Sequence, residues 1–221
     1  MAEIRFAGTD TTARAGKIVC LGRNYIEHAK EMKADVPTTP VLFLKPASAL
    51  IQDGGTILIP SISNDVHHEV EMVILIGTGG TSIPESEALQ HVGGYAVGLD
   101  MTLRDVQAEA KKKGLPWTVA KGFDTSAPIS LFVRPNAVPD PHNLDIRLSV
   151  NGQLRQHSNT SSMIFRVEQM IASISSIMTL EPGDLIYAGT PEGVGPVQPG
   201  DSLTAELQHV GSLTVSVARR S

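Results

Sequence analysis

Short strand-like segments follow one another along most of this 221-residue chain, and turn residues rather than long helices separate them. Leu203, Ala205 and Leu207 alternate with polar neighbours, which is typical of a half-buried strand. Helical periodicity is too sparse for alternating strand–helix–strand units, so we do not expect a doubly wound sheet. The sequence predicts a β-rich α+β fold with a few helices. The predicted strands are 17–21, 41–44, 56–59, 69–76, 94–99, 144–150, 184–188 and a pair within 203–218, and the predicted helices are 24–33, 85–92, 103–113 and 162–178.

Composition and charge narrow the class of protein. Apolar residues make up 41% of the chain and charged residues 19%, which is ordinary for a globular protein with a core. The net charge of −5 gives no basic excess, so we expect neither a nucleic acid nor a membrane as partner. Cys20 is the only cysteine and no run is apolar enough for export or a membrane span, which predicts a cytoplasmic location. We expect one domain over residues 17–221, after an N-terminal extension or edge strand over 1–16.

Two glutamates share one face of a predicted strand. Glu69 and Glu71 are two residues apart, so both carboxylates point the same way and could bind one cation. The alternative is an exposed edge strand that happens to carry two acids. Asp100 ends the strand 94–99 and could add a third carboxylate, or it could cap the helix that follows. Three carboxylates would suit Mg²⁺ or Mn²⁺, with Ca²⁺ as another option. Zinc is disfavoured, because His67 and His68 face opposite ways.

His28 and Glu31 stand three residues apart in a predicted helix, so the carboxylate could orient the imidazole as a general base. The alternative is a solvated helix face, since other charged residues surround the pair. Arg104 and Gln107 share a face of the next helix, Lys121 follows an apolar stretch, and we interpret the run 111–113 as solvated lysines.

The segment 190–196 follows the strand 184–188 and contains two glycines and two prolines. Its backbone amides and the Thr190 hydroxyl could cradle a carboxylate, although such a loop is more often a rigid turn. Phosphate-loop, dinucleotide-binding, serine-nucleophile and zinc-protease motifs are all absent from the sequence, which disfavours nucleotide and serine-hydrolase chemistry.

In their order and spacing, these motifs resemble the fumarylacetoacetate hydrolase family, and most closely its short acylpyruvase branch, which includes fumarylpyruvate hydrolases. The similarity runs from about residue 17 to the end of the chain. The motifs are Gly22-Arg-Asn-Tyr25 with His28 and Glu31, Leu44-Lys-Pro46, His68-Glu-Val-Glu71, Gly98-Leu-Asp100 with Thr102, Arg104 and Gln107, Gly114-Leu-Pro-Trp117 with Lys121, Asn151-Gly152, and Gly189-Thr-Pro-Glu-Gly-Val-Gly195.

The resemblance implies the family's mixed β-sandwich roll as a single catalytic domain, a homodimer, and a Mg²⁺ or Mn²⁺ site. The metal ligands would be Glu69, Glu71 and Asp100. His28 and Glu31 would activate water on a lid helix, with Lys121 and Gln107 at the developing oxyanion. Arg23, Lys45, Arg104 and Thr190 would contact the substrate.

A metal that chelates a pyruvate unit would stabilise its enolate, which makes the enolate a good leaving group. We therefore expect hydrolysis of a C–C bond in 3-acylpyruvates such as acetylpyruvate or fumarylpyruvate, giving pyruvate and a carboxylic acid. Decarboxylation of oxaloacetate, its keto–enol tautomerisation, or isomerisation of the 2-hydroxyhepta-2,4-diene-1,7-dioate type passes through the same enolate and is the alternative. The reactions differ in their need for water activated by His28. A non-catalytic binding protein is disfavoured, because every expected site position is filled.

Overall fold

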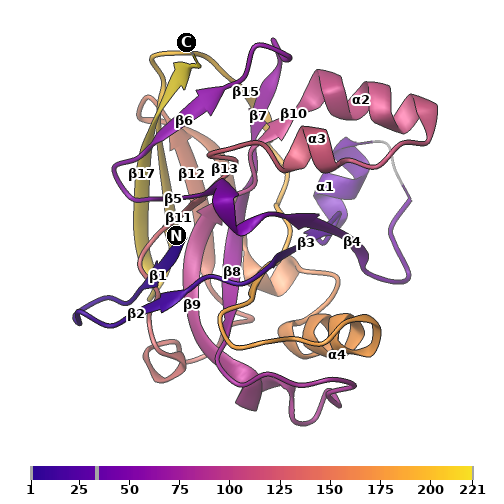
Figure 1. Cartoon of the computed structure of the whole chain (residues 1–221), viewed down its shortest axis with the longest axis vertical. Helices are drawn as coiled ribbons and strands as arrows, with labels where there is room; N and C mark the ends of the chain where they lie inside the picture. The colour runs from indigo at the N-terminus through magenta and orange to yellow at the C-terminus, as the bar shows by residue number, and fades with distance from the viewer. Residues whose placement is uncertain (1, 33–34, 221) are drawn as a thin grey trace.

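The computed structural model describes residues 2–32 and 35–220. Its strands form two large sheets and two small ones, and the helices gather on one side of them (Figure 1). This is the β-rich α+β architecture that the sequence predicts. Across the described residues, no helix combines the length and the apolarity needed to cross a bilayer.

The larger sheet is mixed and has seven strands in the order β4-β3-β14-β8-β9-β11-β5. Pairs β3–β14 and β5–β11 are parallel, and the other pairs are antiparallel. Its middle strand β8 is buried at every residue, because its sequence is apolar on both faces apart from Glu71. The strands are β3 (Ile18–Gly22), β4 (Val41–Lys45), β5 (Leu50–Gln52), β8 (Val70–Ile76), β9 (Val92–Leu99), β11 (Ala127–Ile129) and β14 (Leu185–Tyr187).

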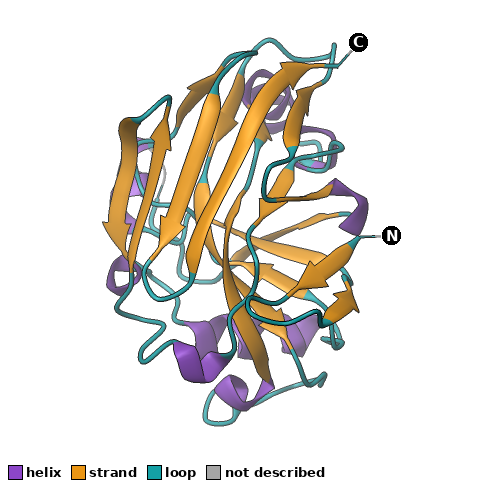
Figure 2. Cartoon of the chain, turned by 90° about the vertical axis from the view of Figure 1, so that its left-hand side faces the viewer, coloured by secondary structure: helices purple, strands orange, loops and turns teal. Residues whose placement is uncertain are grey.

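The second sheet has five strands in the order β13-β12-β16-β17-β6 and forms a curved layer in front of the other sheet in Figure 2. Residues of β16 alternate between buried and partly exposed, as the sequence pattern predicts. The predicted C-terminal pair is the antiparallel hairpin β16–β17, and β6 lies parallel to β17. The strands are β6 (Thr56–Ile59), β12 (Asp145–Val150), β13 (Gln153–Asn159), β16 (Ser202–Leu207) and β17 (Gly211–Arg219).

Two small sheets complete the strand structure. Strands β10 (Thr102–Leu103), β7 (Val66–His68) and β15 (Gly195–Val197) form one sheet beside the carboxyl end of β9. Strands β1 (Glu3–Arg5) and β2 (Thr12–Arg14) form the other sheet. Ile4 and Phe6 are buried, and the Phe6 ring centroid lies 6.1 Å from that of Phe132. The N-terminal segment therefore packs on the core.

The helices differ from the predicted ranges at their ends. The helix predicted over 85–92 is only a 3₁₀ turn, because Val92 already pairs with Ile76 in the sheet. The helix predicted over 162–178 begins five residues later, after a 3₁₀ turn, and Lys33, the end of the first predicted helix, lies outside the described residues. The helices are α1 (Ile26–Glu31), α2 (Arg104–Lys113), α3 (Thr118–Lys121) and α4 (Val167–Ile177), and the 3₁₀ turns are η1 (Ala47–Ala49), η2 (Ala88–His91), η3 (Pro135–Ala137) and η4 (Thr160–Ser162).

Candidate active site

A cavity of about 300 Å³ lies where the ends of β3, β4 and β8 meet α1, α2, α3 and the loop after β14. The cavity is the size of a small-molecule site. Eight of the predicted site residues line it, whereas Glu31, Lys45 and Asp100 do not. The eight are Arg23, His28, Glu69, Glu71, Arg104, Gln107, Lys121 and Thr190.

Three buried carboxylates converge beside this cavity. Glu69, Glu71 and Asp100 each offer an oxygen within 4.8 Å of the others, and no more than 5% of any of these residues is exposed. The interpretation as an exposed edge strand is wrong, because β8 is the middle strand of the larger sheet and pairs on both sides. β8 and the residue just before it thus place two acids in the interior, where they need compensating charge.

Asp100 does not cap a helix. The helix α2 follows Leu103 and has no side-chain cap, whereas Asp100 Oδ2 lies 2.5 Å from the Lys121 ammonium. Asp100 Oδ1 lies 2.8 Å from the Lys45 ammonium but accepts no hydrogen bond. The capping alternative is therefore wrong, and one buried carboxylate oxygen is left with unused acceptor capacity.

Cationic side chains balance the carboxylates. The Lys121 ammonium lies 2.8 Å from Glu69 Oε2 and donates to Thr102 Oγ1 at 2.7 Å, and the Arg104 guanidinium donates to Glu69 Oε1. Burial would raise the pKa of Glu69, but Lys121 and Arg104 outweigh it and hold that pKa well below its usual value. Burial also opposes the charge on Lys121, yet Asp100 and Glu69 raise its pKa.

Glu71 has the least compensation of the three acids. Burial, and then the charges of Asp100 and Glu69, raise the pKa of Glu71 well above its usual value. A single backbone amide, that of Gly189, donates to Glu71 Oε2 at 2.7 Å. A bound cation would offset the repulsion that this carboxyl group meets from Asp100 and Glu69.

The three carboxylates fit a divalent cation. Oxygens bound at about 2.1–2.5 Å to one ion lie roughly 3–4 Å from their neighbours, which the spacing of these atoms allows. An all-oxygen, anionic set suits a hard cation and does not suit structural zinc. His67 lies 3.0 Å from Asp65, and His68 lies 3.0 Å from Gln156, so the structure places neither histidine in this group.

Lys45 lies against Asp100 and not at the cavity surface, where the sequence analysis predicts a substrate contact. Its ammonium donates to the backbone carbonyls of Met101, Lys121 and Ser126, and it pairs with Asp100. Its side chain is completely buried and does not line the cavity. The structure therefore gives the predicted substrate contact no support, and it places Lys45 behind Asp100 as a neutralising charge.

His28 faces inward, whereas its partner Glu31 is exposed. His28 is 5% exposed, and its Nδ1 lies 3.0 Å from Glu31 Oε2, so its Nε2 is the nitrogen left for proton transfer. Glu31 Oε1 also accepts the backbone amide of Gly193 at 3.0 Å. The alternative of a solvated helix face holds for Glu27, Lys30 and Glu31, which are exposed, but not for His28.

The loop 190–196 and the glycine before it bind the protein's own carboxylates. Amides of Gly189 and Gly193 bind Glu71 and Glu31, respectively. A side chain at Gly189 would put its Cβ 2.6 Å from that of Asn24, and its φ of +89° favours glycine. Thr190 lines the cavity, and its hydroxyl accepts the Gln156 amide at 2.9 Å, which leaves its hydrogen for a ligand.

Gln156 on β13 is a site-supporting residue that the sequence analysis missed. Its Oε1 accepts the Val70 amide at 3.1 Å, and its Nε2 donates to Thr190 and to the Pro191 carbonyl, both at 2.9 Å. This buried amide therefore ties β8 to the loop that carries Thr190.

Replacing Gln156 by Leu is expected to lower the free energy of unfolding by about 2 kcal/mol, because buried hydrogen-bonding groups lose their partner. Urea denaturation measures the loss. The control is Gln153→Leu, which changes an exposed residue on the same strand. Equal stability of the two variants would contradict the assigned role.

Comparison with known proteins agrees with this geometry. Residues 17–218 match the model of the fumarylacetoacetate (FAA) hydrolase C-terminal domain. The mitochondrial oxaloacetate tautomerase of Mus musculus is 52% identical over 202 residues, which are 91% of each chain. An uncharacterized protein of Pyrococcus horikoshii is 49% identical over 92% of this chain and 89% of its own.

Solved structures show the same fold. Fumarylpyruvate hydrolase from Pseudomonas aeruginosa, in complex with Mn²⁺ and pyruvate, is 38% identical, with a TM-score of 0.94 over 99% of this chain and 96% of its own. The 2-hydroxyhepta-2,4-diene-1,7-dioate isomerase from Mycobacterium marinum is also 38% identical, with a TM-score of 0.83 over 94% of this chain and 76% of its own. The chain belongs to the fumarylacetoacetate hydrolase family and has the mixed β-rich fold of its members.

Proposed function

We propose that this chain is a divalent-metal-dependent enzyme that interconverts the keto and enol forms of oxaloacetate. The observation that carries the proposal is the group Glu69, Glu71 and Asp100 beside a cavity that His28 and cationic side chains line. A 2-oxo acid offers a carboxylate and a keto oxygen, which such a site can take together. The 52% identity with a protein named oxaloacetate tautomerase supports this reaction ahead of hydrolysis.

A bound divalent cation would supply Lewis acidity, which stabilises negative charge on the 2-oxo oxygen. The chain's own residues would move the protons and hold the substrate. His28 Nε2 is available to take a proton from C3 of the keto acid, and Glu31 at Nδ1 stabilises the imidazolium that results. Return of a proton to the oxygen gives the enol.

Lys121 and Gln107 are proposed to face the developing oxyanion. Lys121 would act through its charge, because its three hydrogens point to Glu69, Asp100 and Thr102. Gln107 accepts from Arg104 at its Oε1, at 2.8 Å, so its amide hydrogens remain for a ligand. Arg104 is held between Gln107 and Glu69, which fixes its guanidinium at the cavity wall. Preorganised donors of this kind act without reorganising during the reaction.

Hydrolysis of fumarylpyruvate or acetylpyruvate is the second candidate. The His28–Glu31 pair that could move a C3 proton could equally activate water, and the Pseudomonas aeruginosa relative is named fumarylpyruvate hydrolase. Both reactions need the same stabilised enolate, so the active-site residues alone do not separate them.

The products separate the candidates. Chelator-treated protein is given oxaloacetate, acetylpyruvate or fumarylpyruvate, with and without Mn²⁺ or Mg²⁺, while enol absorbance, pyruvate and CO₂ are followed. Metal-dependent change in enol absorbance of oxaloacetate without pyruvate or CO₂ is expected. Release of pyruvate and a free acid from an acylpyruvate would establish hydrolysis, and CO₂ from oxaloacetate would establish decarboxylation.

His28→Ala is expected to lower kcat by about 10²-fold or more, which is the usual contribution of general acid–base catalysis. The matched control is Glu27→Gln on the exposed face of the same helix. Added imidazole should restore part of the activity of the His28→Ala protein. A variant that loses hydrolysis yet keeps full tautomerisation would show that the C3 proton does not pass through His28.

A further inference from the structure

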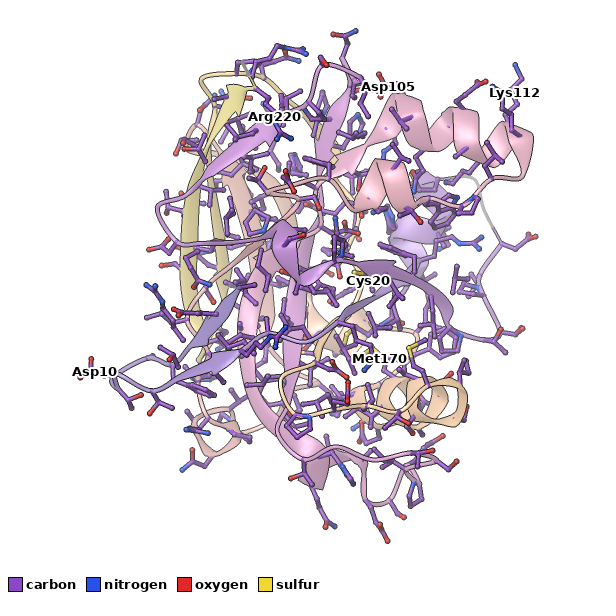
Figure 3. All side chains as sticks on the ribbon, in the orientation of Figure 1. Asp10, Cys20, Asp105, Lys112, Met170 and Arg220 are labelled. Carbon is purple, nitrogen blue, oxygen red and sulfur yellow. The ribbon has the colours of Figure 1, made fainter. Side chains whose placement is uncertain are left out.

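Lys111 differs from the two lysines that follow it. All three lysines are exposed, but Lys111 also lines the cavity. Lys112 projects from α2 into solvent (Figure 3), and Lys113 pairs with Glu109 at 2.7 Å. Residues 104, 107 and 111 are three and four apart, so one face of α2 carries all three toward the cavity. Lys111 is therefore exposed, as the sequence analysis expects, but it also faces the cavity.

The charge of Lys111 has no acidic partner. In the part of the chain that the structure describes, no carboxylate lies within salt-bridge distance of Lys111 or of Arg23. Partial burial, and then the nearby charges of Arg104 and Lys121, lower the pKa of Lys111. An anion in the cavity would relieve this repulsion, while Arg104 and Lys121 already bind Glu69.

An aromatic wall joins the carboxylate group to Lys111. The Lys121 ammonium lies 4.8 Å from the centroid of the Phe43 ring, and the rings of Phe43 and Trp117 are 5.9 Å apart. The Lys111 ammonium lies 5.1 Å from the centroid of the Trp117 ring. The cavity thus has a cation-binding end, a short apolar wall, and an unpaired positive charge at the far end.

We propose that Lys111 binds the second carboxylate of a dicarboxylic 2-oxo acid, and so makes the site prefer dicarboxylates to monocarboxylates. The inference rests on the proposed function only in placing the 2-oxo acid end of the ligand at Glu69, Glu71 and Asp100. The wall of Phe43 and Trp117 suits the short carbon chain between the two anionic ends. Trp117 also positions the ammonium through its ring face.

Binding of two acids that undergo no net conversion under enolisation tests this directly. 2-Oxoglutarate and 2-oxopentanoate differ only in a terminal carboxylate or methyl group, and calorimetry measures the affinity of the Mn²⁺-loaded protein for each. Lys111→Gln is expected to weaken 2-oxoglutarate binding about fivefold and 2-oxopentanoate binding less than about twofold, as a partly exposed ion pair predicts. Lys111→Arg keeps the positive charge and should retain the wild-type preference for 2-oxoglutarate over 2-oxopentanoate. The control Lys112→Gln should change neither affinity.

The salt dependence of 2-oxoglutarate binding is a second test of the role of Lys111. Affinity of the wild-type protein for 2-oxoglutarate should fall more steeply with added NaCl than that of Lys111→Gln, because the variant lacks one charge pair. A wild-type protein that binds both acids equally, or a Lys111→Gln protein that retains wild-type affinity for 2-oxoglutarate, overturns the inference.

Deuterium exchange at C3 distinguishes a failure of the proposed tautomerase function from a failure of the proposed role of Lys111. Exchange into oxaloacetate and into 2-oxobutanoate, which carries a methyl group in place of the second carboxylate, reports proton transfer itself. Lys111→Gln should lower the ratio of kcat/KM for oxaloacetate to that for 2-oxobutanoate about fivefold. Absence of exchange in the wild-type protein with either acid would contradict the proposed function, while calorimetry would still decide the role of Lys111.

Discussion

Asp100→Asn is expected to lower kcat/KM by a factor of about 10³ or more, because Lewis-acid stabilisation of the enolate supplies several kcal/mol. Asparagine keeps the volume of the side chain but removes the negative charge that a hard cation requires. The buried Oδ1 of Asp100, which accepts no hydrogen bond, would no longer be a carboxylate ligand. Calorimetric titration of chelator-treated protein with Mn²⁺ should show the matching loss of affinity.

The control for this experiment is Glu109→Gln, since Glu109 is an exposed acid that pairs with Lys113 on α2. It should bind Mn²⁺ and turn over substrate as the wild-type protein does. A folded Asp100→Asn protein with wild-type Mn²⁺ affinity would contradict the assignment of Asp100 as a ligand. Circular dichroism establishes that both variants fold.

Lys45→Met is expected to lower the free energy of unfolding of the metal-free protein by about 3–5 kcal/mol, the usual cost of breaking a buried ion pair from one side. Methionine has a volume similar to that of lysine. The carbonyls of Met101 and Ser126 and the Asp100 carboxylate nevertheless lose their contact with the ammonium. Urea denaturation in the presence of a chelator measures this loss.

The control is Lys112→Met, which removes an exposed lysine and should shift stability by less than about 0.5 kcal/mol. Saturating Mn²⁺ should recover part of the stability of Lys45→Met, because a cation bound to the folded state compensates the Asp100 charge. A loss below about 1 kcal/mol in the metal-free protein would show that water replaces the ammonium.

Apart from β13, the predicted strands match the longer strands of the structure, because hydrophobic alternation and turn chemistry are local signals. Thr56–Ile59 is found with the predicted bounds, and β8 differs from prediction by one residue. The short strands β7 and β15 were missed, since their three-residue segments pair only through the tertiary fold. The edge strand β13 is mostly polar, so it carries no apolar pattern that could predict it.

The site was predictable where residue type and spacing carry the chemistry. The pair Glu69 and Glu71 has strand spacing, and Arg104 and Gln107 have helix spacing, which extends to Lys111 and could have identified it as well. Lys45 could not be placed in this way, because its partners are backbone carbonyls of residues 101, 121 and 126, which have no sequence signature. Nothing in the sequence marks Gln156 either, because its partners lie far away in the sequence, on β7, β8 and the loop after β14.

The parallel strand pairs have a consequence for the rate of folding. Ile18 lies opposite Leu185, and Ile59 lies opposite Arg219, so both pairings close very long loops. Closing such long loops costs entropy before the stabilising contacts can form, so non-local pairings of this kind make folding slow. The contact of Glu71 with Gly189 spans 118 residues, so it forms only once these loops have closed. The three carboxylates lie around the single antiparallel pair β8–β9, whereas the amide that supports Glu71 reaches it only when β14 has joined the sheet.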